Sequence, residues 1–263
     1  MERKKCQIVL VGHLPEKLIL SIDKETFNKI IFITEKETLS GTIEAKKALD
    51  FLIKYYKKRM VKVESTNFSF QEQTKSIAEL VYIIIQQKLL GFRDITVNVS
   101  GGLRFMDIWF YLGCSITNTK IIHGDFIYKG REEVGINNNV ELVKIPLDKL
   151  TLHQFKFLEL FFENYGDIND FVKLGSEFDN TPILTDTKEF NSINDLKKAF
   201  EGKIRKKISR GAVNGYINKL KENSILLIAP NQENKQKTKI GISYLGIAYF
   251  LNELYNRHKS KFK

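Results

Sequence analysis

The sequence predicts an α/β protein, in which a Rossmann-like domain with a mostly parallel sheet is followed by a mainly α-helical winged helix-turn-helix domain. Short apolar runs alternate with helical patterns as far as Pro146, and from Thr151 onward helices dominate. At 263 residues the chain is long for one domain and comfortable for two. We therefore expect one domain over residues 1–146 and a second over residues 151–263.

The N-terminal half alternates predicted strands, which are short apolar runs, with predicted helices, which carry apolar residues at helical spacing. The predicted strands are Gln7–Val11, Lys29–Thr34, Val61–Glu64, the start of Asp94–Phe110, a hairpin of Lys120–His123 and Asp125–Tyr128, and Val140–Ile145. The predicted helices are Lys17–Ile22, Ile43–Met60, Gln71–Leu90 and Leu103–Ser115, and Thr66–Phe70 is a predicted loop. This alternation is typical of a parallel sheet covered on both faces.

The stretch Asp94–Phe110 combines a buried strand, a Gly-Gly turn and the start of a helix. Gly101 and Gly102 have no Cβ, so a ligand can approach their backbone, and the following helix start offers N–H groups to an anion. Arg104, in the first turn, could add a cation aimed at phosphate. The alternative is that the two glycines only make a tight turn for packing the helix on the sheet.

Three polar loops follow strands whose carboxyl ends meet at one edge of the predicted sheet, where ligands bind in such folds. This predicts a nucleotide-like site. The candidate ligand-binding residues are Gly12, His13, Leu14, Pro15, Thr34, Ser40, Gly41, Thr42, Asn98, Ser100, Gly101, Gly102, Leu103 and Arg104. No G-x-G-x-x-G follows the first strand and no G-x-x-x-x-G-K-[ST] occurs, which disfavours NAD binding and ATP hydrolysis.

The C-terminal half has the order of elements of a winged helix-turn-helix. The predicted helices are Leu152–Tyr165, Ser192–Phe200, Ser209–Asn223 and Tyr244–Tyr255, and the predicted hairpin joins Ser224–Ala229 to Thr238–Ser243 through the polar turn Asn231–Lys237. Glu201-Gly202 and the basic run after it are read as a turn or a short helix, and Gly166–Asn191 as an irregular insertion. In Ser209–Asn223 one face is apolar, through Val213, Ile217 and Leu220, and the opposite face is basic.

Charge favours a polyanionic partner, because 42 Lys and Arg residues against 31 Asp and Glu residues give a net charge of +11. The candidate DNA-binding residues are Arg205, Lys206, Lys207, Ser209, Arg210, Asn214, Asn218, Lys219, Lys235 and Lys237. In a winged helix-turn-helix such residues read base edges or grip phosphates of double-stranded DNA. A solvated cationic face is the alternative.

The remaining composition indicates an intracellular, cytoplasmic protein. Cys6 and Cys114 lie far apart, so neither a disulfide framework nor a metal site is expected. No window reaches about 18 uninterrupted apolar residues, and the N-terminus lacks the pattern of a secretion signal.

An α/β half with the junction TVNVSGGLRFM, joined to a winged helix, resembles the CARF family of CRISPR-associated regulators, and most of all the Csa-three type of archaeal transcription regulators. The turn Ser40-Gly41-Thr42 and the stretch Asn98–Met106 carry the likeness. The resemblance implies a homodimer through the α/β half that binds a cyclic oligoadenylate, by expectation cyclic tetra-adenylate, across its two-fold axis. Binding would then bias the DNA-binding half, which makes the chain a ligand-sensing transcription regulator in antiviral defence.

Of three alternatives to a regulator, two remain open. Some CARF proteins are ring nucleases that cut cyclic tetra-adenylate without a metal, and His13, Ser100, Arg104 and Lys120 could serve such chemistry. A HEPN ribonuclease is set aside, since no His has an Arg at the required spacing before it. The third is a dimeric scaffold whose basic surface serves solubility alone.

Overall fold

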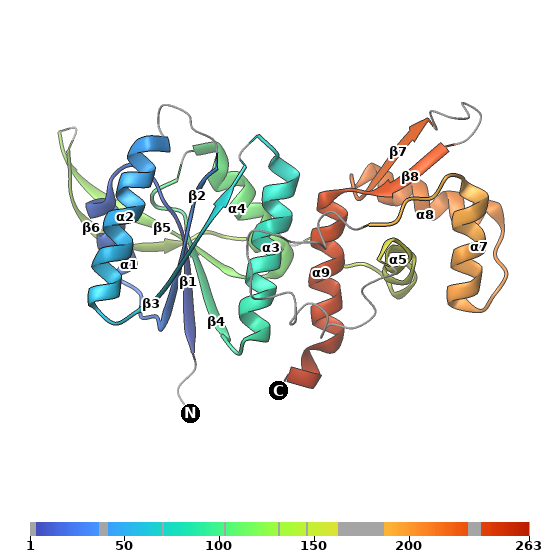
Figure 1. Ribbon diagram of the computed structural model, residues 1–263, viewed down its shortest axis with the longest axis horizontal. Coiled ribbons are helices and arrows are strands. Elements are labelled where there is room, and N and C mark those ends of the chain that lie inside the picture. The colour runs from blue at the N-terminus through green and yellow to red at the C-terminus, as the bar shows by residue number, and fades with distance from the viewer. Residues whose placement is uncertain are drawn as a thin grey trace. The chain divides into compact units, whose positions relative to one another are not determined.

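The computed structural model describes residues 4–36, 42–69, 71–102, 104–130, 132–145, 147–162, 187–230 and 238–262. The chain divides into two compact units, Met1–Leu147 and Asp148–Lys263. The first is built on a six-stranded sheet, and the second combines helices with a two-stranded sheet (Figure 1).

The sheet of the N-terminal unit has the strand order β3-β2-β1-β4-β5-β6. Its strands are β1 Lys5–Leu10, β2 Lys29–Glu35, β3 Lys62–Phe68, β4 Asp94–Asn98, β5 Lys120–Lys129 and β6 Glu132–Glu141. The first five run parallel to their neighbours, and only β6 is antiparallel, to β5. The predicted α/β class with a mostly parallel, Rossmann-like sheet is therefore confirmed.

In the described part of this unit, α1 and α2 cover one face of the sheet and α3 and α4 the other (Figure 1). They are α1 Pro15–Ile22, α2 Thr42–Lys58, α3 Gln73–Leu89 and α4 Arg104–Thr117. Helices α1 and α2 bury one face of β1 and β2 in a cluster formed by Val9, Val11, Leu18, Ile22, Ile30, Phe32, Ala48, Leu52 and Tyr56. On the other face α3 packs against α4, where Gly113 leaves room for Leu80. Burial of these apolar faces, roughly 25 cal/mol per Å², drives formation of the layers.

The predicted hairpin with a turn at His123-Gly124-Asp125 is wrong, because these residues lie within the continuous strand β5. Gly124 is required there by packing and not by a turn: a Cβ would lie 2.6 Å from Cζ of Phe126. The predicted last strand, Val140–Ile145, is also wrong in position, because β6 spans Glu132–Glu141.

Strand β3 is longer than the sequence pattern indicates. The predicted loop Thr66–Phe70 continues the strand as far as Phe68, because Thr66 and Phe68 pair with Ile33 and Glu35 of β2. Both side chains are buried. Residue 70 lies outside the described part of the chain.

Strands β5 and β6 continue past the sheet. Only Lys120–Ile122 pair with β4, whereas the pairing of β5 with β6 runs on to Lys129 opposite Glu132. The outer part of these two strands is therefore a two-stranded ribbon that projects from the edge of the sheet (Figure 1).

The C-terminal unit contains α5 Leu152–Leu158, η1 Glu159–Phe161, α7 Ile193–Ile204, α8 Arg210–Glu222, α9 Tyr244–His258 and η3 Lys259–Phe262. Strands β7 Leu226–Pro230 and β8 Thr238–Ile242 form an antiparallel pair. The ring of Phe157 packs against Phe161, Phe200 and Tyr216, which joins the first three helical segments to α8. Serine hydroxyls accept the free N–H groups at the starts of α7, α8 and α9, at Ser192, Ser209 and Ser243.

Two predicted boundaries in this unit change. The sequence predicts a turn or a short helix at Glu201-Gly202 and the basic run after it. Helix α7 continues through Glu201 and Gly202 to Ile204, and the turn begins at Arg205, which is in the left-handed conformation with φ 53°. The Glu201 carboxylate supports this helix end by accepting from Lys197 Nζ at 2.7 Å and from the Ile208 N–H at 2.9 Å. The α-helix beginning at Leu152 ends at Leu158. Residues 163–186 of the predicted insertion lie outside the described part of the chain.

Candidate functional site: a pocket at the carboxyl ends of β1 and β4, and a basic turn between α7 and α8

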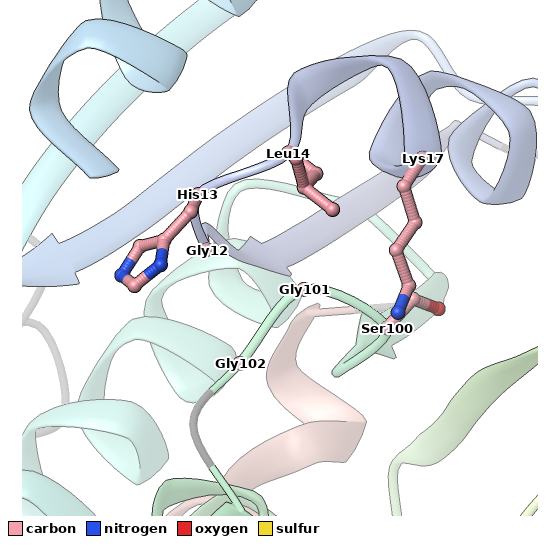
Figure 2. Close-up of a pocket in the computed structure, with 7 residues that line it drawn as sticks. All are labelled: Gly12, His13, Leu14, Lys17, Ser100, Gly101 and Gly102. Atoms are coloured by element: carbon pink, nitrogen blue, oxygen red, sulfur yellow. The ribbon is translucent and has the colours of Figure 1, made fainter. Parts of the chain in front are cut away.

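An open pocket of about 200 Å³ lies where β1 and β4 end (Figure 2). It is lined by Gly12, His13, Leu14, Lys17, Ser100, Gly101 and Gly102. From β1 the sheet extends through β2 on one side and through β4 on the other, so the strand order reverses between these two neighbours. This is the position at which open parallel sheets bind ligands. The structure thus brings together the loop that follows β1 and the loop that follows β4, as the sequence predicted.

Glycine is required at both loops by their mutual packing. A Cβ at Gly12 would overlap the carbonyl oxygen of Gly101, and a Cβ at Gly101 would lie 2.7 Å from Cδ2 of Leu18. The alternative reading of the Gly-Gly turn, close packing, is therefore physically correct. The same packing also leaves a pocket wall made largely of backbone, which an anionic ligand can approach closely.

Beneath the pocket, Ser21 of α1 joins β4 to β6 through buried hydrogen bonds. Its hydroxyl donates to Oδ1 of Asn139 at 2.8 Å and accepts from Nδ2 of Asn98 at 2.9 Å. Since its one proton is used by Asn139, the hydroxyl of Ser100, 2.8 Å away, donates to Ser21. Ser100 Oγ in turn accepts the N–H of Gly124 at 2.8 Å. The predicted site residues Asn98 and Ser100 therefore have a structural role in holding the pocket floor.

The pocket contains a cation that sequence reasoning missed. Lys17, in the first turn of α1, extends toward the turn of Ser100–Gly102, while the imidazole of exposed His13 lies on the far side of Gly12 (Figure 2). The Lys17 ammonium is 4.3 Å from the centre of the Phe126 ring, a cation–π contact. The sequence does contain a signal for Lys17: it stands two residues after Pro15, and proline is typical of the first position of a helix, so Lys17 could be placed in the first turn.

Asp107 of α4 lies against the same turn. A Cβ at Gly102 would lie 2.5 Å from its Oδ1, and this oxygen is buried with no hydrogen-bond partner among the described residues. Burial raises the pKa of the Asp107 carboxyl to about 7, against a smaller opposing effect of the positive charge on Lys17. A cation therefore lines the pocket, and a carboxyl with a raised pKa lies against Gly102 in the pocket wall.

Other predicted ligand-binding residues lie elsewhere. Thr34 and Thr42 do not line the pocket, because both are buried and their hydroxyls donate to Asn67 Oδ1 at 2.6 Å and Glu35 Oε2 at 3.1 Å. Pro15 begins α1 and Leu14, 58 % exposed, lies at the rim. Ser40, Gly41 and Leu103 lie outside the described residues, as does the side chain of Arg104, the first residue of α4.

Lys120 cannot act together with the pocket residues. It is the first residue of β5 and lies beside Thr96 in the middle of β4, whereas Ser100 follows the carboxyl end of β4. Four residues of extended strand separate these levels by roughly 13 Å. Lys120 is paired instead with Glu25 at 3.1 Å. The expectation that it could serve cleavage in the pocket is therefore wrong.

The second candidate site is the turn between α7 and α8 together with the start of α8. The exposed predicted residues at this position are Arg205, Lys206, Lys207, Ser209, which caps α8, and Arg210, whereas exposed Asn218 and Lys219 lie further along, toward the C-terminal end of α8. The buried face of α8 consists of Val213, Ile217 and Leu220, as predicted. Among the described residues none of these exposed cations forms an ion pair.

Other basic residues of this unit are neutralised by acids. Lys197 pairs with Glu201 at 2.7 Å, Lys203 with Glu159 at 3.5 Å, and Lys239 of β8 with Glu189. Asn214 is half-buried, and its Oδ1 has no partner among the described residues. Lys235 and Lys237 lie outside the described part of the chain. The described cations of the α7–α8 turn are thus not neutralised in the way that Lys197, Lys203 and Lys239 are.

Three further observations concern metal ligands, cysteine thiols and membrane-spanning helices. In the described residues no group of three His, Cys, Asp or Glu side chains is placed to hold a metal ion. Cys6 and Cys114 are buried free thiols, and burial raises the pKa of both, that of Cys6 to about 12. None of the helices in the described ranges has the length and apolar character needed to cross a membrane.

No protein-family model and no curated protein matches the sequence. Among solved structures, the chain is similar to Csm6 of Enterococcus italicus bound to cyclic hexa-2'-fluoro-hexa-dAMP, with a TM-score of 0.40 and 9 % identity over 99 % of this chain and 78 % of that chain. It is similar to Can2 of Sulfobacillus thermosulfidooxidans in complex with cyclic tetra-adenylate, with a TM-score of 0.35 and 12 % identity over 96 % and 63 %.

A third similar structure is BpsR of Bordetella bronchiseptica, whose DNA binding is regulated by 6-hydroxynicotinic acid. Here the TM-score is 0.27 and the identity 20 %, over 45 % of this chain and 65 % of that chain. The chain thus spans less than two thirds of the length of the BpsR and Can2 chains. All three TM-scores lie below 0.5, and the fold assignment given above rests on strand order and pairing.

Proposed function

We propose that this chain is a ligand-responsive DNA-binding regulator. Its C-terminal unit binds double-stranded DNA as a winged helix-turn-helix, and its N-terminal unit binds a cyclic oligoadenylate in the pocket at β1 and β4. The observation that carries the proposal is the α7–α8 turn, where exposed cations without acidic partners meet the start of a helix whose other face is buried.

The geometry of this turn supports contact with DNA. Helix α7 ends at Ile204 and α8 begins at Arg210, so five residues join the two helices, with Arg205 in the left-handed conformation. The N-terminal residues of a second helix placed in this way contact the major groove, and its free N–H groups favour phosphate. The antiparallel pair β7 and β8 follows α8 in the position of a wing.

The pocket supports a nucleotide ligand. Its wall is backbone at Gly12, Gly101 and Gly102, and it contains the Lys17 ammonium. A cyclic oligoadenylate, the ligand that the sequence resemblance implies, presents phosphates for these groups. A homodimer through the N-terminal unit would duplicate both the pocket and the basic turn, which suits a palindromic DNA site.

DNA binding is tested with a double charge reversal and a matched control. Lys207→Glu with Arg210→Glu should lower affinity for a duplex at least about tenfold at roughly 0.1 M salt, because phosphate contacts dominate affinity. Lys57→Glu with Lys58→Glu, in the last turn of α2, makes the same change in net charge and should leave affinity within about threefold. Fluorescence anisotropy measures both. Equal losses in the two variants would reduce the proposal to a general effect of net charge.

Ligand binding and cleavage are tested separately. Isothermal titration with cyclic tetra-adenylate should show saturable binding, and incubation in EDTA followed by chromatography should return the ring intact. We propose binding without cleavage because the Ser100 hydroxyl is used in the buried hydrogen bonds and Lys120 lies at the opposite sheet edge. Linear products in EDTA would make the chain a ring nuclease, and absence of any binding would remove this ligand.

A further inference from the structure

Two ionisable side chains lie at the loop that a ligand phosphate would approach. Lys17 lines the pocket from α1, and Asp107 lies against Gly102 from α4. Phe126 of β5 holds the ammonium at 4.3 Å from its ring centre. The amine is therefore held at the pocket by an aromatic face, in a position from which it can meet a phosphate.

The carboxyl of Asp107 is poorly solvated for a charged group. Its Oδ1 is buried, and no described donor lies within hydrogen-bonding distance of it. Burial raises its pKa to about 7, and the charge on Lys17 is the one opposing influence identified. The ionised form of Asp107 is thus stabilised in part by the cation that a bound phosphate would engage.

We propose that Lys17 and Asp107 form a proton-linked phosphate subsite, in which Lys17 binds a phosphate group and Asp107 takes up a proton from solvent as the phosphate binds. The inference rests on the proposed ligand-binding role of the pocket and adds to it the residues and the chemistry. The physical reason is that a bound phosphate compensates the charge of Lys17 and places a like charge near Asp107. Both effects favour the protonated carboxyl.

The sign of the pH dependence follows from this linkage. Protonated Asp107 accommodates a phosphate better than ionised Asp107 does, so affinity should fall as pH rises through 7. If binding raises the pKa of Asp107 by about two units, affinity falls roughly tenfold between pH 6 and pH 8, and about half a proton is taken up per site at pH 7.

Other charged groups near this position define the controls. Helix α1 also carries exposed Glu16, and the loop before it carries His13. From β5, the imidazole of His123 packs edge-on against Phe126, with Asp125 between them in sequence. The side chain of Arg104, on α4 itself, lies outside the described residues. His123→Gln therefore tests whether proton uptake comes from the neighbouring imidazole.

The experiment is isothermal titration of the full chain at pH 6, 7 and 8, which measures affinity. At pH 7 the titration is repeated in a second buffer of different ionisation enthalpy, which measures the number of protons taken up. Cyclic tetra-adenylate and inorganic pyrophosphate are the two probes. We expect wild type and the His123→Gln variant to take up about half a proton at pH 7. Asp107→Asn should abolish the uptake, flatten the pH dependence and bind at pH 8 about as tightly as wild type binds at pH 6.

Two lysine variants test whether the effect on ligand affinity comes from the charge at the pocket or from the net charge of the chain. Lys17→Met should weaken binding at least about tenfold, whereas Lys47→Met, an exposed lysine of α2, should not. Tight binding without proton uptake, or uptake that persists in Asp107→Asn, would overturn the subsite while leaving the proposed function intact. Pyrophosphate binding with uptake, but no binding of cyclic tetra-adenylate, would leave the subsite and remove the proposed ligand. No binding of either probe would overturn both.

Discussion

The pocket and the α7–α8 turn achieve the same end, presenting positive charge to an anion, by opposite structural means. The pocket is formed by backbone at glycine positions that pack against one another, above a buried hydrogen-bonded floor. The α7–α8 turn presents long, exposed side chains from elements whose stability depends on residues facing the other way. In the pocket, binding and folding therefore depend on the same atoms, whereas in the turn they can be changed separately.

The largest contrast is expected at Gly12. Gly12→Ala places a Cβ against the carbonyl oxygen of Gly101, where neither backbone can give way, so we expect a loss of about 3 kcal/mol or more in the free energy of unfolding. Trp109, the one Trp in the sequence, lies buried in α4, so urea unfolding followed by its fluorescence reports on the N-terminal unit. A variant of wild-type stability would show that the two loops can separate without loss.

A smaller effect is expected from the pocket floor. Ser21→Ala leaves Asn98 Nδ2 and Asn139 Oδ1 without their shared partner, which should lower the free energy of unfolding by about 2 kcal/mol. Ser65→Ala, at an exposed position of β3, should change it by less than about 0.5 kcal/mol. The same Trp109 signal measures both variants. If the two serine variants unfold alike, the floor does not contribute to stability in the way described.

In the turn, loss of one charge should affect DNA and not stability. Arg210→Gln should weaken duplex binding by about 1 kcal/mol and reduce the slope of log affinity against log salt by about one. Its thermal melting should match that of wild type, because Arg210 is exposed and Ser209 still caps α8. A change in melting without a change in salt slope would reverse the assignment.

The smallest effect has the opposite sign to that at Gly12. Gly215 lies in α8, and a Cβ added to it would meet no atom within 4 Å, so Gly215→Ala should stabilise the C-terminal unit by about 1 kcal/mol through helix propensity. Far-UV circular dichroism during thermal unfolding measures this change. Destabilisation would mean that this face of α8 is covered.

The sequence predicted the central strands because they are nearly continuous apolar runs, such as Ile30–Ile33, which are typical of strands buried on both faces of a parallel sheet. It failed at Gly124, since a glycine between His and Asp has the composition of a turn. The reason for this glycine, contact with Phe126, lies two residues further along β5 and depends on side-chain packing. Local composition cannot distinguish these two uses of glycine.

The pocket was predicted in part for a similar reason. Its glycines mark the loops, but Lys17 and Asp107 reach it from two helices that are 90 residues apart in sequence, and only the fold brings them together. In the turn, by contrast, the basic residues are contiguous, so their sequence positions alone locate the cluster. Only the acids that neutralise Lys203 and Lys239 required the structure.

The projecting ribbon has a mechanical consequence. Its base is joined to the floor of the pocket where the Gly124 N–H meets Ser100 and where Asn139 meets Ser21. From Gly124 to Lys129 the extended strand reaches roughly 17 Å. The two serines therefore join the base of the ribbon to the strand that ends at the pocket.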